Sequence, residues 1–91
     1  MSTPPQSIDA LRAAIDKVDH HIVQLLSERY KLVCTIQALK RQSGLPPRDP
    51  KRETDMLVRR GQWSEEAELP PAMVIEIFQR ILAHLPPNPD D

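Results

Sequence analysis

The chain has 91 residues, with 12 Lys or Arg and 13 Asp or Glu, so its formal net charge is -1. This length leaves room for one domain, and the near balance of charge argues against nucleic-acid or anionic-membrane binding, which needs a marked basic excess. A single cysteine, Cys34, excludes an intrachain disulfide and a cysteine-rich zinc site.

The composition favours an all-α fold. Only one Phe, one Trp and one Tyr are present, so a core must come from Leu, Ile, Val, Met and Ala, which favours helices over a β-sandwich. No apolar run reaches the roughly 18 residues of a membrane span, and no signal peptide opens the chain. We expect one soluble, cytoplasmic helical domain over residues 1–91, with frayed ends at 1–6 and 86–91.

Ten prolines divide the chain into three proline-free segments, 6–43, 51–69 and 72–85. Proline is excluded from helix interiors because it lacks an N–H and clashes with the preceding turn. We therefore predict three helices, of which the first is far longer than the other two.

The first segment carries an apolar stripe whose members alternate three and four residues apart, as in a heptad seam. We expect Ser7 to cap the start of this helix, and Gly44, which precedes two prolines, to stop it. The stripe consists of Ile8, Leu11, Ile15, Val18, Ile22, Leu25, Leu32, Ile36 and Leu39.

The second and third segments also have start signals. Asp49 is the expected N-cap of the second helix, and Pro50 suits its first position. The third helix begins at Pro70-Pro71, and its apolar residues again follow helical spacing. They are Val74, Ile77, Phe78, Ile81, Leu82 and Leu85.

The length of the first helix predicts a second chain. About 36 residues at 1.5 Å per residue give roughly 54 Å, whereas a compact monomer of this size has a radius of gyration of about 12 Å. The two shorter helices cannot cover the whole stripe, so a second copy is expected to do so. The fold prediction is an intertwined homodimer of three-helix protomers.

One position of the apolar stripe holds a charge, Arg29. A buried ion pair, or a side chain that reaches out to water, is the simple structural explanation. Two more cations, Arg12 and Lys40, flank the stripe on one edge. Along the helix Lys40 lies about 16 Å from Arg29, close enough to share a small anion, whereas Arg12 lies about 25 Å away.

In a dimer, Arg12 can lie close to the cations of the other copy. If two first helices cross antiparallel about their midpoints, Arg12 of one copy lies between Arg29 and Lys40 of the other. Three cations from two chains, walled by aliphatic side chains, suit a small dicarboxylate, because guanidinium groups bind carboxylates bidentately. Asp16 and His20 could in principle bind a metal, but they lack a third ligand, so no metal site is expected.

The ordered set of these residues resembles the all-helical chorismate mutase family (chorismate mutase type II). Order, spacing and residue types match over roughly residues 8–60, while the third helix is similar in pattern only. The matching segments are Leu11-Arg12-x-x-Ile15-Asp16-x-x-Asp19, Leu25-Leu26-x-Glu28-Arg29, Lys40, and Asp49-Pro50-x-Arg52-Glu53.

The resemblance implies an intertwined dimer that rearranges chorismate to prephenate in aromatic amino-acid biosynthesis, without a cofactor or metal. It implies that Arg29 and the other copy's Arg12 hold the two substrate carboxylates, and that Lys40 donates to the ether oxygen and to a carboxylate. It places Asp49 and Glu53 near the substrate hydroxyl, with Arg52 supporting that network.

The sequence departs from the family at its C-terminal end. Pro89 stands where relatives carry a glutamine or glutamate that also donates to the ether oxygen, and Leu85 stands where a serine is expected. Three explanations follow: a weak mutase that a partner enzyme activates, a different substrate, or a tail in which Asn88 substitutes.

Two alternatives to the mutase remain open. In the first alternative, the substrate is a chorismate relative, and the enzyme is a 4-amino-4-deoxychorismate mutase or an isochorismate-pyruvate lyase. The stretch Trp63-Ser64-Glu65-Glu66 resembles the lyases. In the second alternative, the chain is a non-catalytic dimerisation or regulatory module. Turnover of chorismate and the identity of the product distinguish all three.

Overall fold

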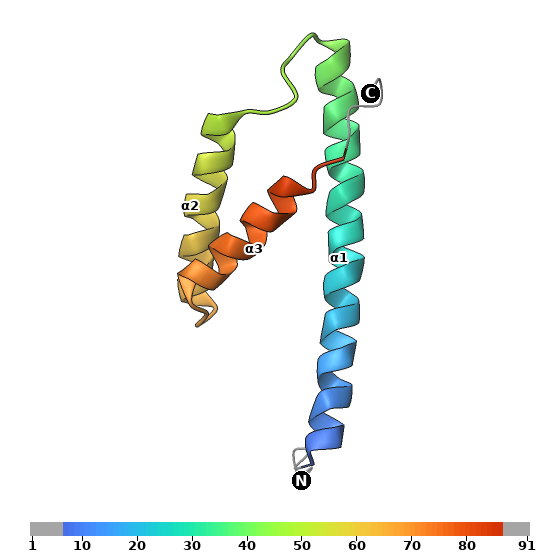
Figure 1. The fold of residues 1–91 in the computed structure, drawn as a ribbon, viewed down its shortest axis with the longest axis vertical. Helices are drawn as coiled ribbons and strands as arrows, with labels where there is room; N and C mark the ends of the chain where they lie inside the picture. The colour runs from blue at the N-terminus through green and yellow to red at the C-terminus, as the bar shows by residue number, and fades with distance from the viewer. Residues whose placement is uncertain (1–6, 87–91) are drawn as a thin grey trace. The chain divides into compact units, whose positions relative to one another are not determined.

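The computed structural model describes residues 7–86 and has three helices within that range, α1 (Ile8–Gln42), α2 (Pro50–Glu66) and α3 (Pro71–Ala83) (Figure 1). The described residues include no strand. The prediction of an all-α protomer with one long N-terminal helix is confirmed, while the intertwined dimer stays a prediction. Of the ends predicted to be frayed, only Pro86 lies within the described residues, and it is not helical.

The chain divides into two compact units whose boundary lies inside α1, between Leu32 and Val33. We call them the N-terminal unit and the C-terminal unit. The C-terminal unit holds the last turns of α1, the loop that follows, α2 and α3. That residues 1–91 form one domain stays a prediction.

The start and stop signals of α1 act as predicted. The Ser7 hydroxyl accepts a hydrogen bond from the backbone N–H of Ala10 at 3.0 Å. Gly44 adopts a φ of 69°, a left-handed conformation that costs glycine little. The N–H of Leu45 then donates to the carbonyl of Lys40 at 2.8 Å, and Gly44 N–H to Arg41 at 3.2 Å. This pair of bonds is a Schellman motif, and it turns the chain back beside the last turn of α1.

The predicted start of α2 is confirmed as well. Asp49 is extended, with a φ of -129°, and its carboxylate accepts from the N–H of Arg52 at 3.1 Å. Pro50 occupies the first helical position, where its missing N–H costs nothing. Residues 49–53 are therefore held in one defined geometry by the cap of α2.

The end of α2 is one feature that the sequence analysis missed. The helix stops at Glu66, before the end of the proline-free segment 51–69. The N–H of Leu69 donates to Ser64 at 2.9 Å, and Glu68 closes the turn with a φ of 59°. No glycine marks this second Schellman-type turn, so a glutamate bears the steric cost of the left-handed conformation.

The two shorter helices pack against each other in the C-terminal unit, with α3 crossing α2 (Figure 1). Met56 of α2 is 5% exposed. Gly61 is also buried, and a Cβ on this residue would meet Ile75 Cδ1 of α3 at 3.3 Å. Glycine thus allows the two helices to approach closely at this point.

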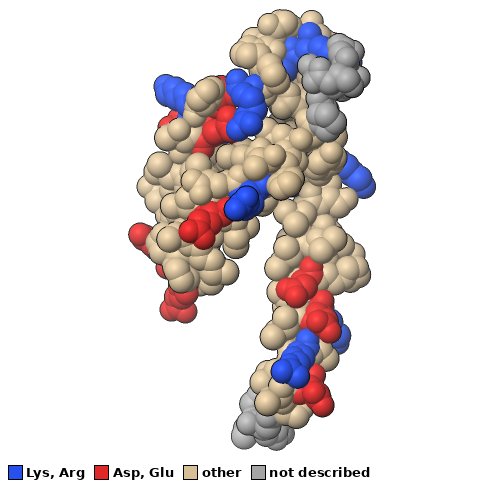
Figure 2. Space-filling model, in the orientation of Figure 1, with Lys and Arg blue, Asp and Glu red and all other residues tan. Residues whose placement is uncertain are grey.

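Within Ile8–Gln42, by contrast, no residue is buried. The nine apolar residues of the predicted stripe are each between 48% and 67% exposed. Acidic and basic side chains are interspersed along the N-terminal part of α1 (Figure 2). No helix within residues 7–86 is both long and apolar enough to span a bilayer.

Candidate functional site

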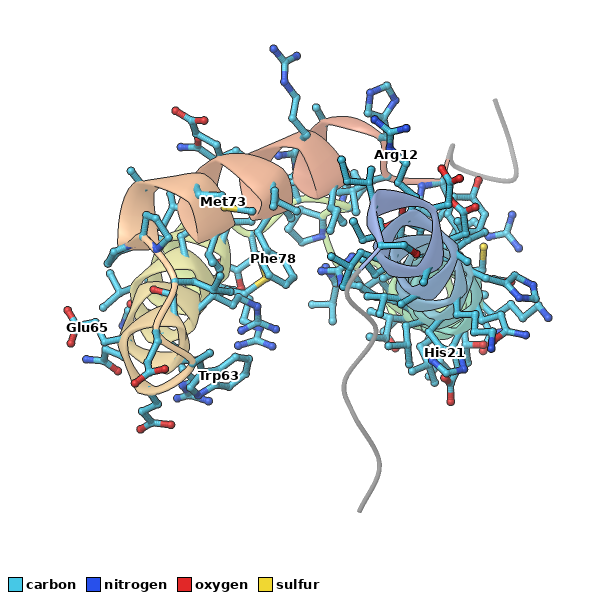
Figure 3. The ribbon with its side chains drawn as sticks, turned by 90° about the horizontal axis from the view of Figure 1, so that it is seen from below. Arg12, His21, Trp63, Glu65, Met73 and Phe78 are labelled. Atoms are coloured by element: carbon cyan, nitrogen blue, oxygen red, sulfur yellow. The ribbon has the colours of Figure 1, made fainter. Side chains whose placement is uncertain are left out.

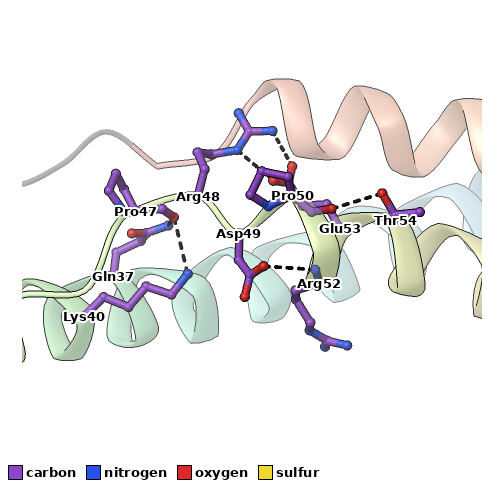
Figure 4. A network of polar contacts seen from close by, with 9 residues as sticks. All are labelled: Gln37, Lys40, Pro47, Arg48, Asp49, Pro50, Arg52, Glu53 and Thr54. Carbon is purple, nitrogen blue, oxygen red and sulfur yellow. Dashed lines mark hydrogen bonds and ion pairs between the residues drawn. The ribbon is translucent and has the colours of Figure 1, made fainter.

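Four of the six predicted site residues lie in the C-terminal unit, around the loop that joins α1 to α2 (Figure 4). Lys40 is in the last turn of α1, Asp49 caps α2, and Arg52 and Glu53 are in the first turn of α2. The Schellman motif at one end of the loop and the Asp49 cap at the other fix these residues on either side of it.

Lys40 contacts the loop directly. Its Nζ donates to the carbonyl oxygen of Pro47 at 3.3 Å, and the Nε2 of Gln37 donates to the same oxygen at 3.1 Å. Both donors are half-buried. They border a hollow of about 210 Å³ whose lining residues are Gln37, Lys40, Arg41, Gly44, Leu45 and Pro47. Two N–H donors therefore converge on one oxygen at the edge of this hollow.

The carboxylates of the site already have partners. Asp49 Oδ1 accepts from the backbone N–H of Arg52. Glu53 is held by the fork of Arg48, whose Nε donates to Oε2 at 3.1 Å while Nη2 pairs with Oε1. The hydrogen bond from Arg48 to Glu53, and then the carboxylate charge, raise the pKa of the Arg48 guanidinium. Asp49 and Glu53 keep unused acceptor lone pairs for a hydroxyl group.

The remaining two predicted site residues lie on the part of α1 that belongs to the N-terminal unit. Arg12 is exposed and Arg29 is half-buried. Figure 3, which looks along α1, shows Arg12 and His21 on opposite sides of the helix. The two residues are nine positions apart, and at 100° per residue this separation ends half a turn away around the helix. That Arg12, Arg29 and Lys40 meet in one pocket stays a prediction.

Two polar residues were not identified as site residues from the sequence. Gln37 lies one turn before Lys40, and Arg48 lies just before the helix cap. The spacing of three residues between Gln37 and Lys40 was a signal that they share one face of the helix. The pairing of Arg48 with Glu53 depends on the backbone turn at Asp49 and has no simple periodicity.

A cation–aromatic cluster joins α2 to α3. The guanidinium carbon of Arg60 lies 4.8 Å from the centre of the Trp63 ring and 5.3 Å from that of Phe78. Figure 3 labels both rings, of which Trp63 remains 49% exposed. The residue pattern alone gave no sign that an arginine links these two rings. Such contacts stabilise helix packing through the negative face of the rings.

Side chains that could bind a metal or act as a thiol lie in the described part of the chain. Among residues 7–86, no three or more His, Cys, Asp or Glu side chains are grouped as metal ligands would be. Cys34 is exposed on α1.

Leu85, which replaces the serine expected from the family, is half-buried. Asn88 and Pro89 lie outside the described residues.

Comparison with known proteins identifies the family of the chain. A family model described as chorismate mutase type II matches residues 11–85, which include nearly all of α1 and the whole of α2 and α3. A solved structure of chorismate mutase (Form I) from Thermus thermophilus is similar, with a TM-score of 0.77 and 38% identity. The match covers 84% of this chain and 94% of that one.

Three relatives show the range of proteins that carry this sequence pattern. The T-protein of Enterobacter agglomerans is 35% identical over 82% of this chain, which spans only 20% of that protein. Chorismate mutase from Methanocaldococcus jannaschii is 30% identical, with 87% of this chain and 80% of that one covered. The isochorismate pyruvate lyase of Pseudomonas aeruginosa is 33% identical, with coverages of 90% and 82%.

Proposed function

This chain belongs to the chorismate mutase type II family, and on that premise we propose that it is an isomerase that converts chorismate to prephenate. The observation that carries the proposal is the family match over residues 11–85, together with the 38% identity to a solved chorismate mutase whose chain it covers almost completely. The chain spans about a fifth of the length of the T-proteins that it also matches.

The reaction needs positioning and electrostatics rather than a nucleophile. Within one substrate molecule the ether C–O bond breaks while a C–C bond forms, and the ether oxygen becomes a carbonyl oxygen. No proton is transferred and no co-reactant is consumed. An enzyme accelerates such a step by holding the reactive chair-like conformer and by stabilising the negative charge that grows on the ether oxygen.

The proposed roles of the cations follow from this chemistry. Arg29 and Arg12 of the partner subunit each bind a substrate carboxylate, since a guanidinium fork matches a carboxylate bidentately. Lys40 donates to the ether oxygen. Support for this role is that Lys40 Nζ already donates to an oxygen, that of Pro47, at the edge of the hollow beside the loop.

On the other side of the loop, Asp49 and Glu53 are proposed to accept from the substrate hydroxyl. Arg52 supports them through its backbone N–H, which binds Asp49, and through its exposed guanidinium. Since Arg48 occupies both oxygens of Glu53, the hydroxyl takes one of the remaining lone pairs of that carboxylate.

We further propose that the active form is a homodimer. The supporting observation is α1, in which the nine stripe residues are all exposed and none of Ile8–Gln42 is buried. A second copy is the occupant that the resemblance implies, and it would bring its own Arg12 to the site. A location in the cytoplasm and an activating partner enzyme stay predictions. The occurrence of this pattern inside the longer T-proteins makes a functional partner worth testing.

One relative favours a second candidate function. The 33% identity to an isochorismate pyruvate lyase supports a lyase reaction on isochorismate at the same site. Of the stretch that suggested this, Trp63 is half exposed and Ser64 is 2% exposed with its hydroxyl bonded to Gly61. Ser64 is therefore a structural residue of α2, which weakens the argument from that stretch.

The test is to incubate the purified protein separately with chorismate, isochorismate and 4-amino-4-deoxychorismate, and to identify the products. Prephenate from chorismate is the expected result. Pyruvate and salicylate from isochorismate, without turnover of chorismate, would overturn the proposal in favour of the lyase. Turnover of the amino substrate alone would identify the other mutase, and turnover of none would leave a dimerisation module. Lys40→Ala should remove at least about 99% of the activity, as expected for a charged donor to the transition state.

A further inference from the structure

Two side chains of α1 share one hydrogen-bond acceptor in the C-terminal unit. Gln37 Nε2 and Lys40 Nζ lie 3.1 Å and 3.3 Å from the same Pro47 oxygen (Figure 4). The two residues are three positions apart and so project from one face of the helix. A carbonyl oxygen has two lone pairs, so it accepts both bonds at once.

The loop that supplies this oxygen is restrained at both ends. Gly44 turns the chain in a left-handed conformation after α1, and Asp49 caps α2. Between them, Pro46 and Pro47 have fixed φ angles and no N–H groups. The Pro47 carbonyl therefore keeps the amide and the ammonium group aimed at a common point beside the hollow.

We propose that Gln37 is a catalytic residue that donates, together with Lys40, to the ether oxygen of the substrate, which replaces the Pro47 carbonyl as their shared acceptor. This rests on the proposed function. As the ether C–O bond breaks and the C–C bond forms, the oxygen gains negative charge before it becomes a carbonyl oxygen. Two donors aimed at one such oxygen form the kind of preorganised site that stabilises a developing oxyanion.

The neutral amide suits this task beside a lysine. It adds a donor without adding a second positive charge next to the Lys40 ammonium, and it does not titrate near neutral pH. Both side chains turn together from the carbonyl to the substrate, because their spacing on one helix face keeps them directed at a single acceptor. The interaction with Pro47 gives both donors an acceptor before substrate binds.

The first test compares Gln37→Ala with Gln42→Ala, a matched substitution of another glutamine near the end of α1. If Gln37 donates mainly in the transition state, kcat falls by roughly 10- to 100-fold while KM changes little, because the lost interaction belongs to the transition state. Gln42→Ala should match the wild type. Equal kinetics of the two variants, with a wild type that converts chorismate, overturn this inference and leave the proposed function standing.

The second variant is Gln37→Glu, measured over a range of pH. A carboxyl group donates only when it is protonated, so the activity of this variant should rise as the pH falls, relative to that of the wild type. A constant ratio of the two activities over the whole range would contradict the role of Gln37 as a donor.

Binding measurements show whether Gln37 acts in catalysis or only holds the loop through its hydrogen bond to Pro47. The probes are two bicyclic dicarboxylates shaped like the chair-like transition state, one with a bridging ether oxygen and one with a methylene in its place. Gln37→Ala should weaken binding of the ether probe by about the same factor as kcat, and binding of the methylene probe far less. Equal weakening of both probes would mean that Gln37 only holds the loop, and the inference would be wrong. A wild type that converts no chorismate would instead refute the proposed function itself.

Discussion

Arg48 and Glu53 form a two-pronged ion pair across the start of α2, in which the guanidinium fork of a loop residue holds the carboxylate of a first-turn residue (Figure 4). The Arg48 side chain is 55% exposed and that of Glu53 only 19%. The pair therefore holds the half-buried Glu53 carboxylate, which together with Asp49 is proposed to bind the substrate hydroxyl, in a single orientation. Because solvent screens the exposed Arg48, the ion pair adds little to the free energy of unfolding.

Replacement of Arg48 should impair activity without unfolding the protein. We expect Arg48→Ala to lower kcat/KM roughly tenfold, since Glu53 loses a charge-assisted, two-pronged partner. Lys51→Ala, which removes an equally charged and exposed residue nearby, is the control and should have a smaller effect. An arginine is charged far above neutral pH, and the pair with Glu53 raises the pKa of Arg48 further. The ratio of variant to wild-type activity should thus be constant from neutral to mildly alkaline pH, as steady-state kinetics can check.

A substitution at Glu68 should stabilise the protein. Glu68 has a φ of 59°, which is strained for a residue with a Cβ and unstrained for glycine. We expect Glu68→Gly to raise the free energy of unfolding by about 0.5–1 kcal/mol net, because relief of about 1–2 kcal/mol of backbone strain exceeds the roughly 0.4–1 kcal/mol that glycine costs through the unfolded chain. Glu65→Gly, inside α2, should lower it by about 1 kcal/mol. Urea unfolding at one fixed protein concentration measures both, and a loss of stability in Glu68→Gly would contradict this account of the turn.

The contact of Gly61 with Ile75 sets the spacing of α2 and α3. An alanine Cβ would lie 3.3 Å from Ile75 Cδ1, the far end of a flexible side chain, so the neighbour has to shift slightly. The better helix propensity of alanine offsets this cost, and Gly61→Ala should change stability by less than about 1 kcal/mol. Gly61→Leu should destabilise by about 1–3 kcal/mol through overpacking. Thermal unfolding of the two variants provides the check, and a well-tolerated leucine would show that the helices are not closely packed there.

The local signals in the sequence predicted the helix boundaries well, because they act within a few residues. Ser7, Gly44 and Asp49 each perform the cap or stop expected of them. The end of α2 was missed because Glu68 takes the conformation that usually marks a glycine. Local rules contain no information on which strained residues a fold tolerates.

The candidate site was predicted only in part, for a different physical reason. Helical spacing predicts the face of α1 on which Lys40 lies. It does not predict that Lys40 contacts the Pro47 carbonyl, because the turn at Gly44 brings that loop residue to Lys40. The link from Arg48 to Glu53 likewise arises from the loop geometry. Contacts made by irregular backbone depend on dihedral angles that residue periodicity does not encode.

The apolar stripe of α1 provides a test of the proposed dimer. Ile22 is 48% exposed in the single chain, and burial against a second copy would make a charge there costly. We expect Ile22→Asp to give monomers or unfolded chains, and to remove activity with the dimer. His21→Asp, on the neighbouring position 100° away, should leave the dimer intact. Light scattering coupled to gel filtration gives the mass, and a wild-type monomer would contradict the proposed assembly.

The most direct test of a site shared between two protomers is to refold Arg12→Ala and Lys40→Ala together in equal amounts. Each variant alone should be inactive. In a heterodimer, one site combines the intact Arg12 of one chain with the intact Lys40 of the other, while the second site lacks both. Random pairing makes half of the dimers mixed, so the account predicts recovery of about a quarter of wild-type activity. If the mixture stays as inactive as its components, each site is built within one chain, and the shared cationic pocket is refuted.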